Sequence, residues 1–118
     1  MQLNYLTIMV RDIDATTTFY RELVGLQEIR RMELEAGTIV FMAHGEGETM
    51  LEFIEFEQAE KVLTQGMVMS FRSVEPLEQV HERAVNLGYA PTEIKDEPPK
   101  PRYFTVADPD GITVEFSG

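Results

Sequence analysis

Alternating apolar and polar residues near the N-terminus predict a β-strand over residues 5–10. The pattern then changes to helical spacing over residues 13–24, where Asp12 or Asp14 can cap a helix and Gly25 can end it. The apolar stripe of this helix consists of Phe19, Tyr20, Leu23 and Val24.

Three short strands are predicted to follow the helix. They are expected at residues 27–34, 38–43 and 49–56. Gly37 and the run "HGEGE" supply turns between these strands, and a polar connector follows from about residue 57 to 65. The first half of the chain is therefore expected to fold as β-α-β-β-β.

The same order of elements returns in the second half. A strand over residues 67–73 leads to a helix over residues 76–87 that begins near Pro76 and ends before Gly88. The run "DEPPKP" is too rich in proline for regular structure and is predicted to be a loop. The remaining strands are expected at residues 92–95, 102–107 and 112–116.

Equal spacing between the halves supports an internal repeat. The two helix-stopping glycines, Gly25 and Gly88, lie 63 positions apart, and so do Glu52 and Glu115. Both glutamates stand between large apolar residues in the last strand of their half. The repeated order of elements predicts two related modules, at residues 1–57 and 66–118, within a single domain.

Strand alternation divides the expected side chains between two faces. One face is apolar and suits packing under helices: Leu6, Ile8, Val10, Leu51, Phe53, Val68, Phe104, Val106, Val114 and Phe116. The other face mixes polar, aromatic and methionine side chains and suits the lining of a concave ligand site: Tyr5, Thr7, Met9, Met50, Glu52, Ile54, Met67, Met69, Phe71, Tyr103, Thr105, Thr113 and Glu115.

Composition narrows the class of protein. The 118 residues carry a formal charge of −11 and include no cysteine. The absence of cysteine excludes disulfides and thiolate sites, and the acidic balance disfavours nucleic acid and anionic membranes as partners. With neither a basic leader nor an apolar run of about 18 residues, we expect a soluble, cytoplasmic protein.

Two stretches resemble the signatures of the vicinal oxygen chelate superfamily, which includes glyoxalase I, extradiol dioxygenases and bleomycin-type resistance proteins. The first is "LTIMVRDIDATTTFYRELVGL" and the second is "YFTVADPDGITVEF", in which Glu115 follows Gly111 by four residues. The resemblance covers nearly the whole chain. It implies an α+β fold in which two βαβββ modules form a cupped mixed β-sheet with the helices outside, and it is compatible with many chemistries.

The resemblance also bears on metal binding. Metal-dependent members usually take a histidine from the first strand and a glutamate from the last strand of each module. Here the glutamate positions hold Glu52 and Glu115, whereas the first-strand positions are assigned to Tyr5 and Met69, which do not suit zinc or iron. The two histidines, His44 in a turn and His81 in a helix, are expected to be solvated. We expect no metal cofactor; the alternative is a divalent metal held by Glu52, Glu115 and Tyr5 with waters.

Three functions remain open. The first is a metal-independent protein, resembling the bleomycin-type antibiotic resistance branch, that sequesters an aromatic or cationic small molecule as a homodimer. The second is a metal-dependent glyoxalase-type lyase or isomerase, or a dioxygenase, with a reduced metal site. The third is an accessory module with no ligand of its own. The expected ligand-binding residues are Tyr5, Thr7, Met9, Met50, Glu52, Met67, Met69, Phe71, Tyr103, Thr105 and Glu115.

Overall fold

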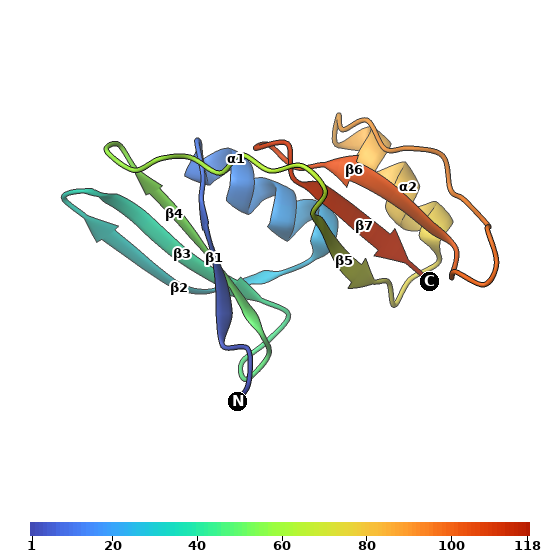
Figure 1. Ribbon diagram of the computed structural model, residues 1–118, viewed down its shortest axis with the longest axis horizontal. Coiled ribbons are helices and arrows are strands. Elements are labelled where there is room, and N and C mark those ends of the chain that lie inside the picture. The colour runs from blue at the N-terminus through green and yellow to red at the C-terminus, as the bar shows by residue number, and fades with distance from the viewer. The chain divides into compact units, whose positions relative to one another are not determined.

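The computed structural model describes all 118 residues and has an α+β fold with two small mixed sheets (Figure 1). The chain divides into two compact units, residues 1–62 and 63–118. Each unit contains one sheet and a helix that packs on one of its faces. None of the helices is long and apolar enough to cross a membrane.

The first unit has the predicted order β-α-β-β-β. Its elements are β1 (Tyr5–Met9), α1 (Ile13–Thr18), η1 (Phe19–Val24), β2 (Gln27–Leu34), β3 (Gly37–Ala43) and β4 (Met50–Phe56). The strand order is β1-β4-β3-β2, with β1 parallel to β4 and the other pairs antiparallel.

The predicted first helix is confirmed, with its second half wound as a π-helix, η1. Asp12 caps it, because its carboxylate accepts hydrogen bonds from the backbone N–H groups of Asp14 and Ala15 at 3.0 and 3.1 Å. Gly25 ends it with a left-handed backbone, φ 88°. Three residues of its apolar stripe, Phe19, Tyr20 and Leu23, are buried, and the Tyr20 and Phe53 rings lie 4.8 Å apart.

Gly37 is required where β2 turns into β3. Its φ is +145°, and a Cβ at this position would lie 1.9 Å from the backbone oxygen of Glu55. Only glycine allows β4 to approach the turn this closely.

The second unit contains β5 (Val68–Arg72), α2 (Leu77–Asn86), β6 (Tyr103–Ala107) and β7 (Thr113–Ser117). The strand order is β5-β7-β6, with β5 parallel to β7 and β6 antiparallel to it. Helix α2 packs its apolar side on this sheet (Figure 1). The buried side chains of this core include Leu77, Val80, Ala84, Phe104, Val106, Val114 and Phe116.

The strand predicted at residues 92–95 is wrong, because the structure has only an isolated bridge between Lys95 and Tyr103. The Thr92 N–H does donate to the Thr105 carbonyl at 2.8 Å. However, the Thr105 N–H donates to the hydroxyl of Thr92 at 2.9 Å, so a side chain replaces a backbone acceptor. This substitution interrupts the regular backbone ladder beside β6.

Candidate functional site

The predicted site residues of the first unit lie on one face of its sheet. Strand register pairs Tyr5 with Met50, Thr7 with Glu52, and Met9 with Ile54. Because side chains alternate along a strand, this face is opposite the one that packs on the helix. We call it the helix-free face of the first unit and define it by Tyr5, Thr7, Met9, Met50 and Glu52.

Glu52 has one hydrogen-bond partner on this face. The Thr7 hydroxyl on β1 donates to Glu52 Oε1 on β4 at 2.5 Å, and the Glu52 side chain is half-buried. Beside this pair, the rings of Tyr5 and Phe41 meet edge to face with centroids 5.3 Å apart. The face therefore combines one carboxylate with an aromatic pair and two thioethers, a mixture that suits an apolar ligand carrying a polar group.

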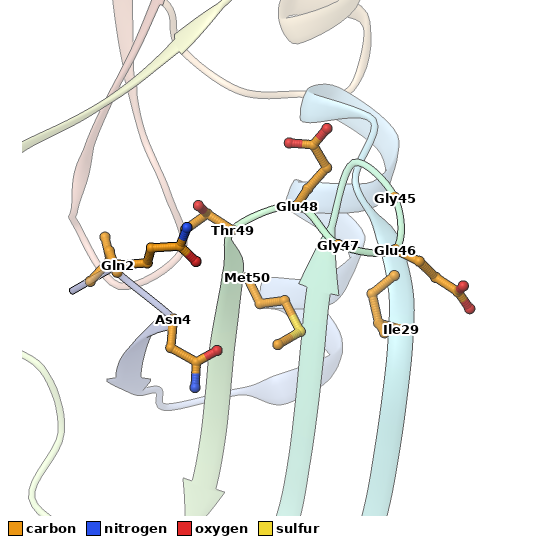
Figure 2. Close-up of a pocket in the computed structure, with 10 residues that line it drawn as sticks. Gln2, Asn4, Ile29, Gly45, Glu46, Gly47, Glu48, Thr49 and Met50 are labelled. Atoms are coloured by element: carbon orange, nitrogen blue, oxygen red, sulfur yellow. The ribbon is translucent and has the colours of Figure 1, made fainter.

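Two hollows lie on the first unit at opposite ends of β1. The larger, about 720 Å³, is lined by residues 2–4, Ile29 and residues 45–50. Figure 2 shows Gln2, Asn4 and Met50 around it, with the side chains of Glu46 and Glu48 pointing away from Met50. The smaller, about 460 Å³, is lined by residues 7–9 and 59–62, and so includes Thr7 and Met9.

In the second unit the equivalent carboxylate, Glu115, is buried and has two partners. The Ser70 hydroxyl on β5 donates to Glu115 Oε1 at 2.8 Å. The Lys100 ammonium donates to Oε2 at 2.9 Å, and the Glu115 side chain is only 11% exposed. The hydrogen bond from Lys100, against the opposing effect of burial, holds the pKa of Glu115 below its ordinary value. The same hydrogen bond raises the pKa of Lys100.

Lys100 also contacts an aromatic ring. Its Nζ lies 4.0 Å from the centroid of the Tyr103 ring, within cation–π range. The Tyr103 hydroxyl in turn donates to Glu97 Oε1 at 3.0 Å. Strand register places Thr105 directly beside Glu115 and Tyr103 beside Ser117. We call this the helix-free face of the second unit and define it by Ser70, Tyr103, Thr105 and Glu115.

The face assignment made from the sequence for β5 is wrong. Met69 pairs with Val114 and Phe71 with Phe116, so both lie on the helix side of the sheet and not beside Glu115. The Phe71 and Phe116 rings are stacked, with centroids 6.2 Å apart. Met67 precedes the strand and is exposed. The error arose because β5 has apolar residues on both faces: Val68, which is 53% exposed, was expected in the core.

Sequence reasoning missed Ser70 and Lys100. The 63-residue spacing that relates Glu52 to Glu115 also relates Thr7 to Ser70, and it would have identified the hydroxyl partner of each glutamate. Lys100 has no such signal, because it lies in the proline-rich loop outside the regular elements. The expectation that His81 is solvated is also wrong: its ring packs edge to face on Phe104 and its Nε2 lies 3.0 Å from the Thr92 carbonyl oxygen.

The donor set on these faces does not suit a divalent cation. No three His, Asp or Glu side chains form a group that could hold a metal. On the face with Glu52, the ring of Tyr5 packs on Phe41. In the second unit, Met69 lies on the helix side of its sheet. At Glu115 an ammonium group already neutralises the carboxylate and would repel a second cation.

Comparisons with known proteins agree on one family. The family model "Glyoxalase/Bleomycin resistance protein/Dioxygenase superfamily" matches residues 2–116. The uncharacterized protein YwbC of Bacillus subtilis is 31% identical over 128 residues, covering 98% of this chain and 95% of its own.

Solved structures share the fold at low identity. TnmS3, an antibiotic binding protein from Streptomyces sp. CB03234, has a TM-score of 0.79 at 19% identity, with 99% of this chain and 94% of that chain covered. The trypanothione-dependent glyoxalase I of Leishmania major has a TM-score of 0.79 at 22% identity, with 100% and 86% covered.

Proposed function

We propose that this chain, which belongs to the Glyoxalase/Bleomycin resistance protein/Dioxygenase superfamily, is a metal-independent binding protein for aromatic or cationic small molecules. Ligand binds on the helix-free face of a unit, and no bond is made or broken. We further propose that residues 1–118 act as a single domain and that the protein is cytoplasmic and works as a homodimer. We also propose that it has a role in antibiotic resistance.

The observation that carries this proposal is the set of hydrogen-bond partners of the two glutamates. Thr7 donates to Glu52, while Ser70 and Lys100 donate to Glu115, so each carboxylate has a partner from its own unit. A catalytic metal requires ligands that converge on an open coordination position. Within its own unit, neither carboxylate is part of such a group.

The surrounding side chains support binding of an apolar body with a charged or polar group. Aromatic rings and flexible thioethers accept varied apolar shapes. The proposed ligand-binding residues include most of the set expected from the sequence, without Met67, Met69 and Phe71, and with the two partners of Glu115 added. The full set is Tyr5, Thr7, Met9, Met50, Glu52, Ser70, Lys100, Tyr103, Thr105 and Glu115. The description of TnmS3 as an antibiotic binding protein is consistent with such a role within the family.

The proposal is tested by metal analysis and a ligand screen on the same purified protein. We expect no stoichiometric metal after dialysis against divalent cations, and an increase in melting temperature with some aromatic or cationic compounds. Loss of this increase in Glu52→Gln or Glu115→Gln would assign the carboxylates to the site. Turnover of a glutathione hemithioacetal or a catechol that a chelator abolishes would overturn the proposal in favour of the enzyme alternative.

A further inference from the structure

The ammonium group of Lys100 lies in a position with the two features that proteins use to bind organic ammonium ions. A carboxylate oxygen of Glu115 lies 2.9 Å from Nζ, and the face of the Tyr103 ring lies 4.0 Å from it. A negative charge beside an aromatic face attracts a cation through both its charge and the ring quadrupole.

The parts of this position are held in place without Lys100. The Ser70 hydroxyl fixes one oxygen of the Glu115 carboxylate, and Glu97 accepts a hydrogen bond from the Tyr103 hydroxyl. Strand pairing fixes the backbones of β5, β6 and β7. The carboxylate and the ring would therefore keep their places if the lysine side chain left.

The Lys100 side chain can move into solvent at little cost, whereas leaving the Glu115 carboxylate without a neighbouring cation is costly. The Lys100 side chain is 50% exposed. It lies between Pro99 and Pro101, in the loop that leads from the bridge at Lys95 to β6. Solvent can accept its ammonium. By contrast, the Glu115 side chain is 11% exposed, and an unpaired buried carboxylate is unfavourable.

We propose that Lys100 is an internal substitute for the ammonium group of a ligand, which displaces it from Glu115 and takes its place over the Tyr103 ring. The inference rests on the function proposed above and deepens it by naming the ligand class: an aromatic compound that carries an alkylammonium group. A divalent metal ion is not the expected occupant, because only one carboxylate, that of Glu115, bonds Lys100 Nζ.

Lys100 then acts as a tethered competitor. If the site is free of lysine only about a tenth of the time, the apparent affinity for the ligand is reduced about tenfold. Removing the ammonium from the tether should restore the intrinsic affinity, and only for ligands that carry a positive charge.

The test uses calorimetric titration with benzylammonium and with its neutral analogue, benzyl alcohol. The full chain is compared with Lys100→Met, which removes the charge but keeps a flexible apolar side chain. Lys95→Met is the matched control, since it removes the same charge from an exposed residue of the same connector that has no contact with Glu115. The double variant Lys100→Met/Glu115→Gln removes both charges.

We expect Lys100→Met to bind benzylammonium about tenfold more tightly than the wild type, while Lys95→Met is unchanged. The gain should disappear in the double variant, and benzyl alcohol should bind equally to all four proteins. An equal gain in Lys95→Met would assign the effect to net charge and overturn the inference. Unchanged benzylammonium binding in Lys100→Met, with benzyl alcohol still bound, would overturn the inference and leave the proposed function standing.

A second measurement uses the wild type alone. Addition of benzylammonium should shift the NMR resonance of the Lys100 ε-methylene toward its position in Glu115→Gln, where the ion pair is absent. An unmoved resonance at saturation would show that Lys100 stays in place, and would contradict displacement. Binding of neither probe to any of the four proteins would overturn both this inference and the aromatic-ligand proposal.

Discussion

Each unit places a glutamate in its last strand, beside the parallel first strand of that unit, but the two units surround this glutamate differently. Glu52 is half-buried and accepts one hydrogen bond, from Thr7, while Glu115 is buried and accepts from Ser70 and Lys100. The hydroxyl on the first strand is common to both, and the cation is present only in the second. The difference shows that burial of the carboxylate goes together with neutralisation of its charge, as desolvation requires.

Replacing each glutamate by glutamine should give the largest difference in stability between the two sites. Glutamine offers one acceptor and one amide donor, so at position 115 either Ser70 or Lys100 would face another donor. At position 52 the amide oxygen can still accept from Thr7. We expect Glu115→Gln to lower the free energy of unfolding by about 1 to 2 kcal/mol and Glu52→Gln by less than about 0.5 kcal/mol. Urea unfolding measures both, and equal losses would contradict the comparison.

The pH dependence of the stability loss in Glu115→Gln sharpens the comparison. The pKa of Glu115 lies below its ordinary value of 4.5 in the folded protein, so its contribution is present above pH 4.5 and is lost as the pH falls through the lowered pKa. The pKa of Lys100 lies above its ordinary value of 10.5, so its contribution is present below pH 10.5 and is lost as the pH rises through the raised pKa.

The stability difference between the wild type and Glu115→Gln should therefore be constant from about pH 5 to pH 10 and smaller on either side of this range. Three other glutamates with lowered pKa values, Glu28, Glu75 and Glu78, occur in both proteins and cancel in the difference. Chemical denaturation across the pH range measures it. A difference that grows below pH 4 would show that Glu115 is not stabilised in its charged form.

Removing the hydroxyl partners should give the smallest effects. Ser70→Ala leaves a buried oxygen of Glu115 without a donor, whereas Thr7→Val leaves an oxygen of Glu52 that water can reach. We expect a loss of about 1 kcal/mol for Ser70→Ala and about half of that or less for Thr7→Val. Thermal unfolding of the two variants provides the measurement, and a larger loss for Thr7→Val would reverse the expected order.

Much of the fold could be predicted because its signals are local. Asp12 and Gly25 bound the first helix, and β2 occupies the residues predicted for it between the glycines at 25 and 37. The phase of β5 could not be obtained this way, since Val68, Met69 and Phe71 are all apolar and alternation cannot choose between its faces.

Part of the candidate site depends on contacts that sequence patterns do not encode. Lys100 reaches Glu115 from an irregular loop, 15 residues away along the chain, and no periodicity applies there. The hydroxyl of Thr92 likewise replaced a backbone acceptor, which turned an expected strand into a single bridge. Such contacts arise from tertiary structure and override local propensity.

The proline-rich loop that carries Lys100 has a consequence for how this scaffold can change. The residue that neutralises Glu115 belongs neither to a strand nor to the packed core, so substitutions at position 100 change the charge beside Glu115 without changing a strand or a core side chain. We expect variants at position 100 to change the charge beside Glu115 on a constant set of strands, with a loss of stability where the new residue is not cationic.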